Sequence, residues 1–337
     1  MNYSKSAISG VSWYSVLRLI VRSLILVKVA ILAHVLLPSQ FGEFGAAAIV
    51  LGLFEIFTET GINPFLLQEK TDPTAYVNTA WVISIVRGLL ISTLIFLASP
   101  FIAVFFHNPS LRNLLYVLCL VPVIRGFINP LIIKFQKNLE YKNESFYRLA
   151  IITVELVITV ALAVLTHSVY SFVWGLIVSA LVEVLLSHAI IKIRPVFQFD
   201  LNQAKTILRR GKWVTGFGIL DYVYTQGDNT VVGRLMDQSS LGIYQNAYKI
   251  SALPLTEIGE VFYKVTFPIF VQLSDDPPRL RSAAVKSAVL LTGTLFVAGV
   301  SLFFLAQPLV QIVLGPNWSA TVPIVKALAF LGFFRGC

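Results

Sequence analysis

The chain alternates between long apolar runs and short polar stretches. Each run is close to, or longer than, the roughly 20 residues that a helix needs to cross a bilayer. Turn-forming residues separate the runs, as in Leu37-Pro38-Ser39-Gln40 and Ser274-Asp275-Asp276-Pro277-Pro278. The pattern predicts an all-α membrane protein, a polytopic bundle of about ten transmembrane helices. The predicted spans cover residues 13–37, 44–67, 79–98, 111–133, 146–165, 170–191, 213–235, 241–271, 284–305 and 320–335.

Composition supports this class. Hydrophobic residues make up 56% of the chain, charged residues 13%, and the mean hydropathy is +0.79. A soluble domain usually carries about 25% charged residues, so this chain could not cover a water-facing surface. A net charge of +9 would suggest nucleic-acid binding in a soluble protein. In a membrane protein the same charge gathers in the cytoplasmic loops, and we expect no nucleic-acid partner.

The charges also predict an orientation. If the N-terminus is cytoplasmic, the loops on the opposite side hold Arg112 alone among Lys and Arg. This contrast favours a multi-pass protein of the bacterial cytoplasmic (inner) membrane with its N-terminus inside. The thirteen basic residues of the cytoplasmic loops are Lys5, Lys70, Lys134, Lys137, Lys142, Lys192, Arg194, Lys205, Arg209, Arg210, Lys212, Arg279 and Arg281.

The sequence contains an internal repeat. Residues 13–44 align with residues 213–244 at an offset of 200 without a gap, placing Gly42 on Gly242. A shorter similarity relates the run that begins at Pro100 to the run that begins at Pro308. Six predicted spans separate the two copies, and an even number makes the copies parallel, as in some two-lobed transporters.

The repeat predicts two lobes. Residues 1–190 would form an N-terminal lobe of six spans, residues 191–212 a basic cytoplasmic linker, and residues 213–337 a C-terminal lobe of four spans. The last apolar run has no polar tail behind it. We therefore expect a truncated sequence whose second lobe lacks at least two spans.

Ionisable residues within the spans are the candidate functional residues, because charge inside a membrane is costly and usually faces an interior or a cavity. Counting from the turns places Arg22 near the depth of Glu59, Lys28 near Glu55, and Asp228 near Lys249. The candidate substrate-binding charges are Arg18, Arg22, Lys28, Arg87, Arg125 and Lys249. The candidates for ion coupling or buried pairing are Glu55, Glu59, Asp221 and Asp228.

Two interpretations of these charges stay open. In one, they are buried ion pairs that hold adjacent helices together. In the other, they line a hydrophilic cavity between the lobes and contact an anionic cargo. Cations outnumber carboxylates in the first-lobe spans, and guanidinium groups match phosphate well. An alternative for Arg18 is that its side chain extends to the cytoplasmic surface.

The sequence has no catalytic signature. It lacks the Gly-x-Ser-x-Gly, Gly-x-x-x-x-Gly-Lys and His-Glu-x-x-His patterns, and its two cysteines have no metal-ligand spacing. Its loops are too short to house a catalytic domain. We therefore expect a protein that is not an enzyme and that needs no metal or cofactor.

Several short blocks resemble one family, the polysaccharide-export flippases of the O-antigen and colanic-acid type, within the multidrug/oligosaccharidyl-lipid/polysaccharide exporter superfamily. The blocks are Ser9-Gly10-Val11-Ser12-Trp13, Leu36-Leu37-Pro38-Ser39-Gln40-Phe41-Gly42, Asn63-Pro64-Phe65-Leu66-Leu67-Gln68-Glu69-Lys70, Leu241-Gly242-Ile243-Tyr244-Gln245-Asn246-Ala247-Tyr248-Lys249, Phe267-Pro268-Ile269-Phe270 and Leu314-Gly315-Pro316-Asn317-Trp318. The resemblance covers the whole chain. Members usually have twelve or more spans, so a chain that stops in its tenth departs from the family.

The resemblance implies alternating access around a central cationic cavity. That cavity would bind the pyrophosphate-sugar head of an undecaprenyl-linked oligosaccharide, and the prenyl tail would stay in lipid. Glycosyltransferases and a polymerase of the same pathway are implied as partners. One alternative is a multidrug or cation antiporter of the same fold, which should show a net acidic cavity. Another is a non-transporting scaffold of a polysaccharide assembly complex, in which the charges serve packing alone.

Overall fold

The structure is a computed structural model that describes residues 20–69 and 72–336, and within that part the chain is helical with no strand. A first helix covers residues 20–35. The others are α2 (Pro38–Phe57), α3 (Ile62–Gln68), η1 (Pro73–Tyr76), α4 (Val77–Phe105), α5 (Ser110–Leu118), α6 (Leu120–Gly126), η2 (Pro130–Ile133), α7 (Lys134–Lys137), α8 (Tyr141–Thr166), α9 (Tyr170–Ile190), α10 (Leu201–Leu235), α11 (Gln238–Gln272), α12 (Pro277–Val313), η3 (Pro316–Trp318) and α13 (Thr321–Gly336).

Five of the described helices are long and apolar enough to cross a membrane, and a bent pair would make a sixth. The bent pair joins residues 110–126 to residues 130–137 at an angle of 71°. The described residues of the ten predicted spans lie mostly in helices, which confirms the polytopic all-α class, although only five or six of the described segments meet the length and hydropathy of a span. The five helices are Pro38–Phe57, Pro73–Phe105, Tyr141–Thr166, Tyr170–Ile190 and Pro277–Val313.

Polar residues at the turns set where the helices begin. Asp200 accepts hydrogen bonds from the Asn202 and Gln203 N–H groups and so caps α10. Residues 201–212 of the predicted linker therefore belong to a helix, and α10 begins twelve residues before the predicted span. The division of the chain into two lobes and a linker stays a prediction.

The internal repeat appears in the helix boundaries. The helices before the repeated turns end at residues 35 and 235, and the next ones begin at Pro38 and Gln238. The two starts are again 200 residues apart for α4 at Val77 and α12 at Pro277. Each turn is closed by its own cap. Asp237 accepts from the Ser240 N–H, and Gln40 accepts from the Leu37 N–H.

The two copies meet at Gly42 and Gly242. A β-carbon added at Gly42 would overlap the carbonyl oxygen of Gln238, and one added at Gly242 would overlap the carbonyl oxygen of Pro38. Pro38 and Gln238 are themselves repeat equivalents, so the contact between α2 and α11 is reciprocal. Reciprocal contacts of this kind are what a two-fold relation between the copies produces. Both positions need glycine because backbone meets backbone there.

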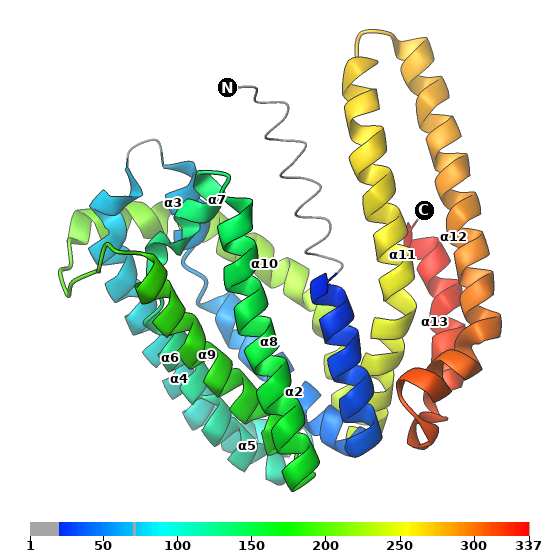
Figure 1. Ribbon diagram of the computed structural model, residues 1–337, viewed down its shortest axis with the longest axis horizontal. Coiled ribbons are helices and arrows are strands. Elements are labelled where there is room, and N and C mark those ends of the chain that lie inside the picture. The colour runs from blue at the N-terminus through cyan, green and yellow to red at the C-terminus, as the bar shows by residue number, and fades with distance from the viewer. Residues whose placement is uncertain (1–19, 70–71, 337) are drawn as a thin grey trace.

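An aromatic cluster packs near the start of α2. Trp318 is fully buried, and its indole N–H donates to the Ala33 carbonyl over 2.9 Å. The Phe41 ring lies edge-on to Trp318 and to Phe172, with centroids 4.9 and 5.2 Å away. In Figure 1, α11 and α12 lie on one side, α4 to α9 lie on the other, and the blue helix of residues 20–35 lies between them.

Candidate functional site: two charged cavities

The predicted second span is interrupted, and the interruption creates the first part of the site. Helix α2 ends at Phe57, and α3 begins only at Ile62. Gly61 joins them at a φ of 65°, in the left-handed region that glycine adopts at little cost. Gly61 also packs so closely against Gly211 of α10 that a β-carbon would not fit. The break leaves backbone carbonyls of the α2 C-terminus without helical partners, and these need other donors.

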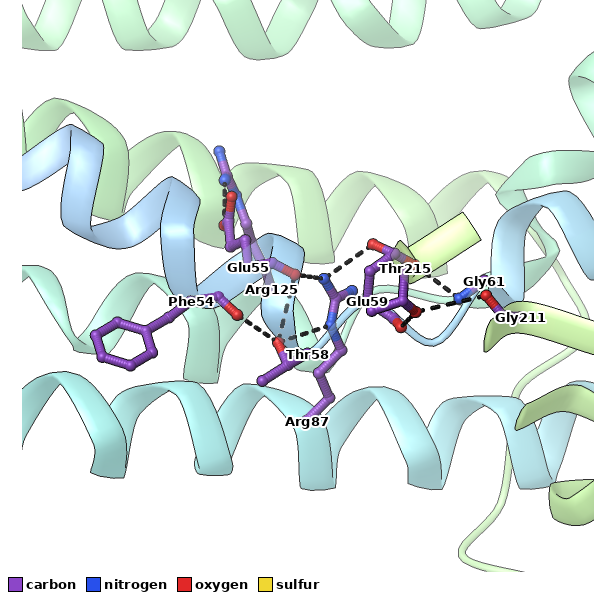
Figure 2. Close-up of polar contacts among 9 residues, drawn as sticks. All are labelled: Phe54, Glu55, Thr58, Glu59, Gly61, Arg87, Arg125, Gly211 and Thr215. Carbon is purple, nitrogen blue, oxygen red and sulfur yellow. Dashed lines mark hydrogen bonds and ion pairs between the residues drawn. The ribbon is translucent and has the colours of Figure 1, made fainter. Parts of the chain in front are cut away.

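Arg87 of α4 donates hydrogen bonds to acceptors at this break. Its Nη2 donates to the Glu55 carbonyl over 2.7 Å and to the Glu59 carboxylate over 2.9 Å. Glu59 also accepts from the Gly61 N–H over 2.9 Å, and its carbonyl accepts from the Thr215 hydroxyl over 2.5 Å. Figure 2 shows Arg87 and Thr215 converging on the break from different helices. Arg87 is therefore bound within the protein through its guanidinium group.

Arg125 of α6 holds two further carboxylates. Its guanidinium lies 3.5 Å from Glu55 and 3.7 Å from Glu183 of α9. The three side chains are between about one fifth and one third exposed. Such partly exposed pairs are weaker than fully buried ones, because water screens them. The pairs join α2, α6 and α9 around a polar interior.

These residues line a first cavity of about 600 Å³ within residues 55–183. Arg148 joins its rim and pairs with Glu144 over 2.9 Å. The lining holds more carboxylates than guanidinium groups, the opposite of the cation excess counted over the spans. The carboxylates are Glu55, Glu59, Glu144, Glu155 and Glu183, and the cations are Arg87, Arg125 and Arg148.

A second cavity of about 320 Å³ lies between the two repeat copies. Lys28 of the first helix and Lys249 of α11 both line it, together with Glu155 of α8. Lys28 Nζ lies 2.5 Å from Glu155 Oε1. The cavity thus holds two ammonium groups and one carboxylate, and the carboxylate pairs with Lys28. Glu155 lines both cavities and is therefore the charged residue common to them.

One wall of the second cavity is aromatic. The rings of Phe44 and Phe172 stack with centroids 4.5 Å apart and planes at 12°, and Phe41 lies beside them. Gln245 of α11 adds an amide. The cavity therefore combines an apolar wall with cationic groups and few other polar groups, a combination typical of ligand sites.

The other predicted site residues lie elsewhere. Arg22 pairs with Glu257 and lies 4.0 Å from Glu260, both on α11. Asp221 is exposed on α10. Asp228 accepts a hydrogen bond of 3.0 Å from the Tyr244 hydroxyl. Arg18 lies outside the described residues. The structure therefore brings together Lys28 with Lys249, and Glu55 and Glu59 with Arg87 and Arg125.

Placing charged residues at equal depth in the membrane did not identify which of them form ion pairs. Lys28 pairs with Glu155 although counting placed it near Glu55, and Arg22 pairs with Glu257 although counting placed it near Glu59. Depth along a helix does not fix the direction in which a side chain points, so residues at one depth can lie on opposite faces.

Other lining residues were not among the sequence-derived candidates. Glu155 and Glu183 were visible as charges within spans, and Glu144 and Arg148 have the i, i+4 spacing of a helix pair. Gln245 carries no charge and gives no comparable signal. Within the part of the chain that the structure describes, no group of three or more His, Cys, Asp and Glu side chains could hold a metal ion.

Comparisons with known proteins identify the family and the fold of the chain. The profile of a family described as polysaccharide biosynthesis protein matches residues 31–323. The lipopolysaccharide biosynthesis protein WzxC of Escherichia coli K12 is 25% identical over 99% of this chain and 68% of its own length. The teichuronic acid biosynthesis protein TuaB of Bacillus subtilis 168 is 23% identical over 98% and 69%, respectively.

Two further similarities concern transport proteins. The succinoglycan biosynthesis transport protein ExoT of Rhizobium meliloti 1021 is 23% identical over 97% of this chain and 66% of its own length. A solved structure of a multidrug resistance MATE family transporter, in its inward-facing conformation, superposes with a TM-score of 0.57. It covers 93% of this chain and 80% of its own at 13% identity, so it supports the fold alone.

Proposed function

The chain belongs to the polysaccharide biosynthesis protein family, and on this premise we propose that it carries lipid-linked oligosaccharides across the membrane. The cargo would be an undecaprenyl-pyrophosphate-linked sugar chain of bacterial surface polysaccharide biosynthesis. The protein would be a carrier and not an enzyme. We place it in the cytoplasmic membrane with its N-terminus inside, beside the glycosyltransferases and polymerase of its pathway.

The second cavity carries this proposal. Lys28 and Lys249 come from different repeat copies and face one space of about 320 Å³. A site built from both copies changes shape when the copies move against each other, as alternating access requires. A phosphate between two ammonium groups replaces the water that each charge loses on burial. The Phe44 and Phe172 rings provide an apolar wall for the rest of the head group.

Removing each lysine charge tests the proposal. We expect Lys28→Met and Lys249→Met each to lower surface polysaccharide on the order of tenfold, because each removes a charge-assisted contact with the phosphate. The measurement is surface polymer in cells that lack the native gene, at matched membrane levels of each variant. Lipid-linked oligosaccharide should accumulate in the same cells.

The exposed Lys205 on α10 lines neither cavity, so Lys205→Met is the matched control. It should leave polymer unchanged. Normal polymer in both cavity variants would reject the proposed site. It would favour the non-transporting scaffold, in which membrane-embedded charges serve packing alone.

The first cavity supports a second candidate, a multidrug or cation antiporter. Its five carboxylates face three guanidinium groups, and an excess of carboxylates suits a cationic ligand. An antiporter predicts that Glu55→Gln and Glu183→Gln reduce efflux of a cationic dye without reducing surface polymer. A carrier of lipid-linked sugars predicts no dye efflux by the wild-type protein.

A further inference from the structure

Glu155 lies where the two cavities approach each other. It occupies the middle of α8, lines both spaces, and has a side chain that is 25% exposed. No other charged residue of the described chain lines both. A rotation of this side chain would move its carboxylate from one cavity toward the other.

In the second cavity, Glu155 balances one of two cations. Its carboxylate holds Lys28 at 2.5 Å. Lys249 makes no hydrogen bond or ion pair with its ammonium group among the described residues. An ammonium group away from bulk water needs an anion, because its desolvation is otherwise uncompensated. The second cavity thus has an internal anion for Lys28 and an excess of one positive charge.

We propose that Glu155 is the internal counter-anion that the phosphate of the cargo displaces from Lys28, an inference that rests on the proposed function. A phosphate that bridges Lys28 and Lys249 would face the Glu155 carboxylate as a like charge. Glu155 then moves toward the first cavity, whose lining includes Arg125 and Arg148. When the cargo leaves, Glu155 returns to Lys28 and opposes rebinding.

This exchange makes Glu155 a specificity residue. A ligand with a single negative charge would replace the Glu155 carboxylate as the partner of Lys28, and this exchange of one anion for another would give little binding free energy. A diphosphate carries more negative charge and can contact both ammonium groups, so it can displace the Glu155 carboxylate from Lys28. The internal anion therefore selects a phosphate-bearing head over carboxylated sugars or lipids, and it limits the affinity so that release stays possible.

The test is the binding of inorganic pyrophosphate to the purified protein in detergent, measured by isothermal titration calorimetry. Glu155→Gln removes the competing charge and keeps the shape. We expect it to bind pyrophosphate at least about tenfold more tightly than wild type. Glu140→Gln is the matched control because the exposed Glu140 lines neither cavity. Its affinity should stay within about twofold. A residue with a structural role alone would weaken binding or leave it unchanged when replaced.

A second variant keeps the test decisive if Glu155→Gln does not fold. Glu155→Asp retains the charge but is one methylene shorter, so it releases Lys28 and still repels the ligand. It should bind pyrophosphate more tightly than wild type, by less than the roughly tenfold expected for Glu155→Gln. If every Glu155 variant that folds binds pyrophosphate no more tightly than wild type, the counter-anion role is overturned.

Lysine variants separate this failure from failure of the site itself. If Lys28→Met and Lys249→Met lose pyrophosphate binding while the Glu155 variants gain none, the site stands and only the counter-anion role is rejected. If the lysine variants bind pyrophosphate as wild type does, the site and the inference that rests on it both fail.

Discussion

The two repeat copies begin alike and then diverge. Helices α2 and α11 start 200 residues apart and touch through Gly42 and Gly242, yet α2 ends at Phe57 whereas α11 continues to Gln272. The sequence accounts for part of this difference. The first copy has Thr58 and Gly61 at the break, and the second has Ile258 and Val261 at the corresponding positions. The Thr58 hydroxyl donates to the Phe54 carbonyl, which Ile258 could not do, and Gly61 adopts a left-handed conformation that the β-branched Val261 would disfavour.

The charged residues at the break have no charged counterparts at the equivalent positions of the second copy. The positions of Glu55, Glu59 and Arg87 are occupied in the second copy by Leu255, Gly259 and Ser287, and the helix there is continuous. The first copy therefore leads into a polar interior in which five carboxylates face three guanidinium groups, and the second contributes Lys249 to the other cavity. The turns that both copies share form the contact between them. The segments in which the copies differ supply the charged side chains of the two cavities.

The largest expected effect concerns the shared contact. Gly42→Ala places a methyl group on the Gln238 carbonyl, and backbone cannot yield without separating α2 from α11. We expect a loss of about 2–3 kcal/mol, as for overpacking in a core. The unfolding midpoint in detergent measures it. Gly227→Ala is the control, because nothing lies within 4 Å of its added carbon. Equal midpoints for the two variants would contradict a close contact at Gly42.

The next effect concerns the break in α2. Arg87→Met leaves the Glu55 carbonyl and the Glu59 carboxylate without their guanidinium. Breaking a buried pair costs about 3–5 kcal/mol. These side chains are about one quarter exposed, so we expect about 2 kcal/mol from the shift of the unfolding midpoint.

Arg148→Met provides the comparison for Arg87→Met. Arg148 pairs with Glu144 near the rim of the first cavity with a side chain that is 55% exposed. Its removal should cost less than about 0.5 kcal/mol. If both arginine variants lose equal stability, Arg87 does not complete the break in the way the geometry indicates.

The sequence predicted the helices better than their interruptions. Apolar runs of membrane length have few stable alternatives in lipid, so the described parts of the predicted spans are mostly helical. The break at residues 58–61 lay inside one such run, and Gly61 and Pro64 were its local signals. The early start of α10 was missed because Lys205 to Lys212 is highly charged. The helix forms there because Ala204, Ile207 and Gly211 bury one face.

For the site, the sequence predicted residue types and not partners. Among these residues, Lys28 and Lys249 line the second cavity, and Glu55 and Arg87 line the first. All but Lys249 are also in ion pairs. Whether they contact a cargo stays a prediction. The pairing of Arg22 with Glu257 depends on how distant helices rotate against each other, which no local pattern records.

A smaller effect should follow from the turn within the break. Gly61→Ala forces a β-carbon into a left-handed conformation and against Gly211. We expect a loss of about 1–2 kcal/mol in unfolding free energy, seen as a lower unfolding midpoint. Gly259→Ala is the matched variant in the second copy. Gly259 lies within a continuous helix with open space around it, so it should be neutral or slightly stabilising. A loss at Gly259 equal to that at Gly61 would remove the distinction between the copies.

The smallest effect concerns Asp72, the carboxylate that precedes η1. Hydrogen bonds from Thr74 and the Lys134 ammonium, 3.2 Å away, lower the pKa of the Asp72 carboxyl. A lowered pKa stabilises the fold above the unfolded-state value, and this contribution is lost as the pH falls through the folded-state value. Asp72→Asn should therefore unfold slightly below wild type from pH 8 to about 5. The difference should begin to shrink near pH 4 and vanish only below the lowered folded-state pKa. Lys134→Met should show the same profile, and a difference that persists unchanged into acid would exclude the charge of Asp72 as its cause.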